Sequence, residues 1–284
     1  MHRIAVTAVV LVSVLAWPRA VSATGHGPVF GAATPTLGRD GWSLDVAWMM
    51  RRSQTEDDQM LRSMIGYGLT EDVQVSVSLP VPLSSSNRMP VGRTMAMMSG
   101  NLDAELLAAW RFHRRVVGEG ARFESTAYVG GTIPLERRHA GMGTAPSLSA
   151  SLASGYASRA HYFWIGGSYQ RPLDNGGERV GDVASLTAVY GYRPPALRLD
   201  YPNPDLRFFV ESVAERTGAA RQGAADMPNT GGSAVLVGPT FLLLYKEYGI
   251  SGGVLLPLRQ RLNGTQPKER VRVGVNFSYF FWLR

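Results

Sequence analysis

The residues at the expected mature N-terminus can bind a divalent metal ion. If the chain is cleaved after Ala23, the new N-terminus reads Thr24-Gly25-His26. A free α-amine, two backbone amide nitrogens and a third-position imidazole together form a square-planar set of nitrogens, which suits Cu(II) or Ni(II). The site depends on cleavage at this one peptide bond, because the amine of Thr24 must be free.

A second group of residues offers soft sulfur ligands. Met95, Met97 and Met98 stand close together in a long polar stretch, and thioether sulfur suits Cu(I). Every methionine after Met1 falls in the half of the expected topology that carries the longer loops. The alternative is that these flexible side chains pack loops onto the rim of the protein. Copper is therefore the one cofactor that the sequence offers, and no cofactor is required.

One motif resembles the surroundings of a catalytic serine. Gly249-Ile250-Ser251-Gly252-Gly253 matches G-x-S-x-G, but this pattern has meaning only on a strand-to-helix turn. Here the motif opens an expected strand, and no helix follows it. The chain has no cysteine, which excludes disulfides, thiolate metal sites and cysteine nucleophiles. We therefore expect no catalytic residues and no enzyme.

The first residues have the features of a secretory signal peptide. A short basic start at His2 and Arg3 precedes an apolar stretch that Pro18 ends, and Val21-Ser22-Ala23 is a small-residue cleavage pattern. The apolar stretch is too short to span a bilayer as a helix. Residues 1–23 are therefore expected to be removed after Ala23, and the protein to be exported.

The composition excludes several classes of protein. Charged residues make up 18% of the chain, against about 25% in an average soluble protein. The formal net charge of +7 comes mostly from arginine, without a basic run interleaved with aromatic residues, so no nucleic-acid partner is expected. After residue 23 no apolar stretch is long enough for a membrane helix.

Alternation of apolar and polar residues is the strongest pattern in the chain. Val73, Val75 and Val77 alternate with Gln74 and Ser76, which predicts a strand with one apolar face. The same period predicts about 12 strands of a size that fits an outer-membrane barrel, at 42–51, 61–69, 73–81, 102–112, 123–133, 147–157, 161–171, 182–192, 206–211, 233–245, 249–259 and 270–281. Of these, 233–245 is apolar on both faces.

The connections between the strands alternate between long and tight. Turns at 70–72, 158–160 and 246–247 are short, whereas 113–121 and 193–204 are longer than typical periplasmic turns. The other set is mostly long and polar. We therefore predict an all-β fold, a single antiparallel transmembrane β-barrel over residues 42–284, with short periplasmic turns and longer extracellular loops. The strands of a secreted β-sandwich can also alternate between apolar and polar residues, but a sandwich does not need so many long strands.

The polar face of the strands is expected to line the lumen. Its residues carry both charge signs, so strong ion selectivity is not expected. They form either a wet pathway for small solutes or a salt-bridge network that fills a narrow barrel. Residues 24–41 precede the first strand and either plug the lumen or lie in the periplasm. The expected lumen-facing residues are Asp45, Arg51, Arg62, Gln74, Asp103, Glu105, Arg111, Glu124, Arg207, Glu211, Arg270, Arg272 and Asn276.

Two segments carry a resemblance to a known family. Residues 67–80, which begin Tyr67-Gly68-Leu69-Thr70 and end Leu79-Pro80, resemble a hairpin of the bacterial outer-membrane family named after the meta-pathway of phenol degradation. Gly27-Pro28 leading into Gly41-Trp42 is similar to the start of that family. The resemblance implies an outer-membrane barrel that passes small organic or aromatic compounds, and it supplies no functional residues.

These patterns together predict an outer-membrane channel or transporter for small solutes in a Gram-negative cell. The alternatives are a copper-handling outer-membrane protein and a structural barrel with a closed lumen. The last strand ends in Tyr279, Phe280, Phe281 and Trp282, which resembles the recognition signal of outer-membrane barrels, although Arg284 departs from it. The expected partners are outer-membrane lipids, the barrel-assembly machinery and small solutes.

Overall fold

A closed antiparallel barrel makes up most of the molecule. The computed structural model describes residues 27–55, 57–83, 103–135, 145–174, 176–199 and 202–283. The barrel strands are β1 (Gly41–Ser53), β2 (Asp57–Gly68), β3 (Val73–Pro82), β4 (Asp103–Gly118), β5 (Ala121–Pro134), β6 (Ser147–Ala157), β7 (His161–Pro172), β9 (Val183–Tyr192), β10 (Asp205–Thr217), β13 (Gly232–Tyr245), β14 (Tyr248–Leu262) and β15 (Glu269–Trp282).

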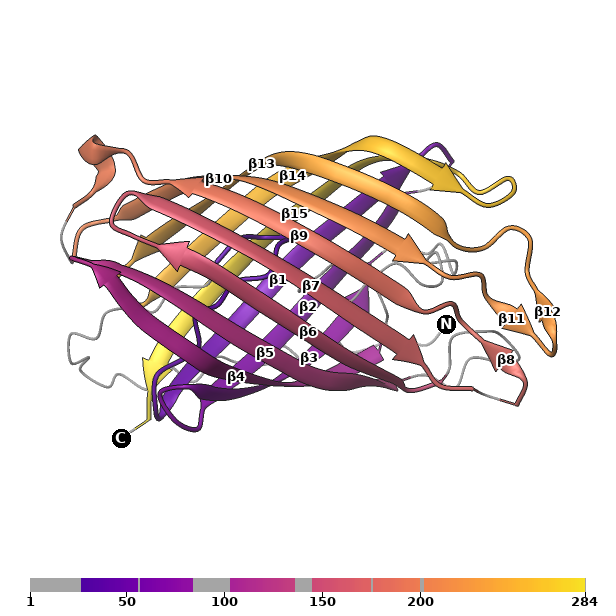
Figure 1. Cartoon of the computed structure of the whole chain (residues 1–284), viewed down its shortest axis with the longest axis horizontal. Coiled ribbons are helices and arrows are strands. Elements are labelled where there is room, and N and C mark those ends of the chain that lie inside the picture. The colour runs from indigo at the N-terminus through magenta and orange to yellow at the C-terminus, as the bar shows by residue number, and fades with distance from the viewer. Residues whose placement is uncertain are drawn as a thin grey trace, which may run out of the picture.

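Each barrel strand pairs with the barrel strands that precede and follow it in the chain, and the first strand pairs with the last. The seam joins β1 to β15 in antiparallel register, with Trp42 opposite Phe281 and Trp48 opposite Val275. Figure 1 shows the tilted strands wrapping around one lumen. The fold predicted from the alternation, a barrel of 12 strands, is confirmed.

The two ends of the barrel differ in their connections. Turns at 69–72, 119–120, 158–160 and 246–247 lie at one end, here called the short-turn end, together with the C-terminus (Figure 1). The opposite, long-loop end carries a small sheet of β8 (Glu178–Arg179), β11 (Arg221–Gln222) and β12 (Ala225–Asp226). Connection 193–204 contains a 3-10 helix, η1 (Pro195–Leu197). In the described part of the chain no helix is long and apolar enough to cross a membrane.

One connection is shorter than the sequence indicated. The stretch 113–121 was expected to be a longer periplasmic connection, but β4 runs to Gly118 and β5 begins at Ala121. Register shifts between Arg111 and His113 and between Val116 and Gly118 interrupt the alternation on β4. A β-bulge adds a residue to one strand and shifts the side-chain period. The hairpin therefore does not show as a continuous period-two pattern.

The side chains alternate between the inside and the outside of the barrel as predicted for β3. Ser76 and Ser78 are buried, whereas Val77 is 41% exposed and Val81 is 52% exposed. These exposed apolar side chains lie on the outer surface of the barrel. This arrangement is the one expected of strands whose outer face contacts a hydrocarbon core.

The outer face of β3 gives a depth-dependent prediction. Val77→Arg, near the middle of the strand, should lower the unfolding free energy by about 2–4 kcal/mol, whereas Val81→Arg, near the strand end, should cost about 0–1 kcal/mol. Urea titration of the folded, heat-modifiable band on gels measures both variants. Equal costs at the two depths would mean that β3 does not cross a hydrocarbon core.

Candidate functional site in the barrel interior

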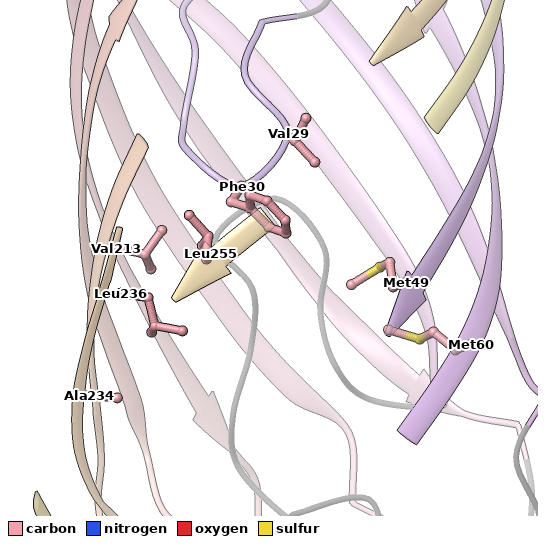
Figure 2. Close-up of a cluster of buried hydrophobic side chains, with 8 residues drawn as sticks. All are labelled: Val29, Phe30, Met49, Met60, Val213, Ala234, Leu236 and Leu255. Atoms are coloured by element: carbon pink, nitrogen blue, oxygen red, sulfur yellow. The ribbon is translucent and has the colours of Figure 1, made fainter. Parts of the chain in front are cut away.

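Residues 27–40, called the inner segment from here on, precede β1, and residues 29–37 of the segment lie inside the barrel. The segment has no regular secondary structure and bends at residues 29–31. Pro28 and Pro35 prevent a continuous helix there. Phe30 and Thr34 are each 1% exposed, and Figure 2 shows Val29 and Phe30 on a loop surrounded by barrel strands. The inner segment therefore occupies part of the lumen.

A single carboxylate on the barrel wall holds the bend of the inner segment. The backbone N–H groups of Val29, Phe30 and Gly31 donate hydrogen bonds of 2.7, 2.8 and 2.7 Å to the carboxylate oxygens of Glu211. The hydroxyl of Thr240 donates a fourth bond of 2.5 Å to the same carboxylate. Glu211 lies on β10 and is fully buried. Successive N–H groups that point at one anion form a concave binding site for it.

Apolar packing complements these hydrogen bonds. Val29 and Phe30 belong to a buried cluster with side chains from β1, β2, β10, β13 and β14 (Figure 2), namely Met49, Met60, Val213, Ala234, Leu236 and Leu255. Further along the segment, Leu37 shares a cluster with Leu242 and Leu244. The inner face of β13 is thus apolar because it packs around the inner segment. This explains why 233–245 is apolar on both faces.

The middle of the inner segment bonds to a different part of the lumen wall, on β5 and β7. Trp164 donates its indole N–H to the hydroxyl of Thr34 at 3.1 Å. Thr126 donates to the carbonyl of Thr34 at 2.6 Å, and the Tyr128 hydroxyl donates to the carbonyl of Ala33. Aromatic side chains are buried here because their polar atoms find partners on the segment.

The segment leaves the lumen close to the barrel wall at the short-turn end. The N–H of Leu37 donates to the side-chain oxygen of Gln74 at 2.8 Å. A Cβ at Gly68 would stand 2.0 Å from the carbonyl oxygen of Gly38, and a Cβ at Gly166 would stand 2.6 Å from the Cβ of Ala32. A side chain at Gly68 would collide with the backbone of the inner segment, whereas one at Gly166 would require the segment near Ala32 to shift.

Buried charges form a compact cluster toward the long-loop end of the lumen. Arg272 is fully buried and donates to Glu215 at 2.7 and 3.1 Å and to Glu269 at 2.8 and 3.0 Å. Arg51 approaches Glu269 at 3.6 Å. The two carboxylates together hold the guanidinium in a fixed plane. This cluster links β1, β10 and β15 across the seam.

Two further arginines, Arg62 and Arg111, form ion pairs along the wall. Arg62 donates to Glu105 and, at 2.7 and 3.0 Å, to Ser78. Near the short-turn end, Arg111 donates to Asp72 at 2.8 Å and to Glu124 at 3.2 Å. The lumen wall therefore carries pairs of opposite sign rather than a field of one sign.

The structure places most of the expected lumen residues away from the outer surface. Arg207 is half-buried and pairs with Asp205 at 2.6 Å. Arg270 differs, because it is exposed while its neighbour Glu269 is buried in the Arg272 cluster. A register shift between Arg52 and Ser53 lies opposite this point, so the alternation slips by one residue. Those buried are Asp45, Arg51, Arg62, Asp103, Arg111, Glu124, Glu211 and Arg272, and Gln74, Glu105 and Asn276 are half-buried.

The expected copper ligands lie outside the described residues. This applies to Thr24, Gly25 and His26 and equally to Met95, Met97 and Met98, so both sites stay predictions. Met49 and Met60, which do lie in the described chain, are buried in the same apolar cluster as Phe30. No group of three or more His, Cys, Asp or Glu residues in the described ranges is arranged to hold a metal ion.

Comparison with known proteins relates the chain to channels by fold. No protein-family model and no curated protein sequence matches the chain. Among solved structures, the COG4313 outer membrane channel from Pseudomonas putida F1 superposes with a TM-score of 0.57 at 11% sequence identity, over 89% of this chain and 98% of that one. The NanC porin aligns with a TM-score of 0.49 at 11% identity, over 83% and 98% of the two chains. The chain therefore shares its β-barrel fold with the COG4313 channel.

Proposed function

We propose that this protein is an outer-membrane channel for small solutes in a Gram-negative cell and that residues 24–41 form a plug in its lumen. In this proposal the signal peptide is cleaved after Ala23, and the barrel-assembly machinery recognises the aromatic-rich strand β15. The likeness to the phenol meta-pathway family favours small organic or aromatic compounds as solutes. The porin-like fold supports a channel rather than an enzyme.

The observation that carries the proposal is the way the inner segment is held. Every contact that retains it is non-covalent, and the strongest set converges on the one carboxylate of Glu211. A lumen that only needed filling could be filled by side chains from the wall, as in other narrow barrels. A separate segment that only hydrogen bonds and packing retain can move without opening the barrel.

Passage through the barrel therefore depends on the position of the inner segment. While the segment is in place, the cavity beside it measures about 120 Å³. Displacement of the segment opens a polar path along the Arg62–Glu105 and Arg111–Glu124 pairs. Because these pairs balance in sign, the open channel passes cations and anions with similar ease.

Planar-bilayer recording of the purified full-length protein tests the proposal. We expect a small, noisy conductance with brief larger openings and a weak preference between K⁺ and Cl⁻. Swelling of proteoliposomes in a series of sugars of increasing size measures the pathway for uncharged solutes. A barrel that folds, shifts on heating and shows neither conductance nor swelling would instead be the structural barrel with a closed lumen.

A further inference from the structure

A cavity remains between the inner segment and one side of the barrel wall. Its volume is about 120 Å³, which corresponds to roughly four water molecules at about 30 Å³ each. The cavity lies between the segment and inward-facing side chains of β1–β5, β14 and β15. It is therefore enclosed partly by a wall that is fixed and partly by a segment that is held only by non-covalent contacts.

The two sides of the cavity differ in polarity. The side formed by the inner segment is mostly apolar and includes Pro28, Ala33 and Leu37, whereas the barrel side presents Gln74 and Ser76 among other polar groups. A molecule that fits both sides has a small apolar surface on one side and hydrogen-bonding groups on the other. Such chemistry is typical of polyols and simple amides.

The charged groups around the cavity already have ion-pair or hydrogen-bond partners within the protein. Arg62 pairs with Glu105. Asp45 accepts hydrogen bonds from Ser278 at 2.5 Å and from Asn276 at 3.3 Å. A charged ligand would lose its hydration in this cavity and would compete with partners that these groups already have within the protein, which is costly.

Neutral hydrogen-bonding groups also line the cavity. The hydroxyls of Ser76 and Ser251 and the amide of Gln74 are part of its wall. Within the described residues, the side-chain oxygen of Asn276 is buried and has no hydrogen-bond partner. That oxygen is too enclosed for a ligand in the cavity to reach, so the hydroxyls of Ser76 and Ser251 are the acceptors that a ligand meets there.

We propose that this cavity binds one small neutral polar molecule, a polyol or an amide, whose donors meet the hydroxyls of Ser76 and Ser251. This inference rests on the proposed function in one respect, since the bound molecule is taken to be a solute that uses the pathway. Glycerol and urea are suitable probes, because they are uncharged and carry both donors and acceptors.

Saturation-transfer NMR on the full-length protein in zwitterionic detergent tests binding without relying on conduction. We expect transfer to glycerol and urea that far exceeds transfer to acetate. Ala109→Leu, which extends into the cavity, should reduce the glycerol signal several-fold. Ala108→Leu on the exposed side of the same strand is the matched control and should leave it unchanged.

A second variant keeps the test informative if Ala109→Leu disturbs packing. The double change Ser76→Ala and Ser251→Ala removes only hydroxyls and should weaken glycerol binding several-fold. Unchanged transfer in this variant, or equal transfer to acetate, would overturn the proposed site. Conductance without glycerol binding would support the proposed channel and contradict the proposed binding site. Glycerol binding without conductance would support the binding site and contradict the channel.

Discussion

Replacement of Glu211 by alanine should raise the open probability of the channel at least tenfold. The variant removes an acceptor that receives three backbone hydrogen bonds from the inner segment and one from Thr240. A hydrogen bond to a charged group contributes about 1.5–3 kcal/mol, and each 1.4 kcal/mol changes an equilibrium about tenfold. Single-channel recording in planar bilayers measures the change, with Glu211→Gln expected to give a smaller increase.

A disulfide that fixes the inner segment to the wall is the matched control. Ala32→Cys combined with Gly166→Cys places two thiols where the Cβ atoms would approach each other closely, near the range that a disulfide spans after a small adjustment of the segment. The chain has no cysteine of its own, so no other disulfide can form. In the Glu211→Ala background the oxidised pair should restore low conductance, and a reductant should release it.

These two experiments together test whether the inner segment closes the lumen. If Glu211→Ala folds, shifts on heating and conducts no better than the unchanged protein, the inner segment does not gate the lumen. If the oxidised disulfide leaves the high conductance intact, ions pass beside the segment. Either result would contradict the proposed gating by residues 24–41.

Replacement of Arg272 by methionine should destabilise the barrel by about 3–5 kcal/mol. The change leaves Glu215 and Glu269 buried without the guanidinium that both of them contact at 2.7–3.1 Å. Unpaired buried carboxylates must either retain an uncompensated charge or take up protons, and both are costly. Urea titration of the folded gel band measures the loss, and part of it should be recovered at low pH, where the carboxylates are protonated.

An exposed pair in the same barrel provides the comparison for Arg272. Arg52 contacts Asp57 at 2.9 Å, and the two side chains are 52% and 42% exposed. Because water screens such a pair, Arg52→Met should cost no more than about 1 kcal/mol. A cost for Arg272→Met as small as that for Arg52→Met would show that the buried cluster does not stabilise the seam between β1 and β15.

The sequence was sufficient to predict the barrel because its strands repeat a simple physical pattern. Val73, Val75 and Val77 alternate with Gln74 and Ser76, and such alternation shows which side of a strand is apolar. Twelve strands with this pattern are compatible with few folds other than a barrel. The pattern failed where a residue is inserted. The register shifts on β4 and opposite Glu269 moved side chains to the other face, so Arg270 was expected in the lumen in place of Glu269.

The position of the inner segment could not be derived from its own residues. A segment rich in Gly, Pro and Thr has no period that indicates a buried face, so a plug and a free periplasmic segment were equally compatible with it. The available signal lay elsewhere, in the apolar inner face of 233–245 and in the wall glycines Gly68 and Gly166. These features indicate that the lumen contains something apolar, but they do not identify it.

The seam between the first and last strands also sets the order in which the molecule can be assembled. The inner segment directly precedes β1, and its main partner Glu211 lies 182 residues from Val29 along the chain. No wall exists to receive the segment until β10 has been placed, and the ring stays open until β15 pairs with β1. Such long sequence separations slow folding. The inner segment can therefore reach its final position only after residues from both halves of the chain have come together.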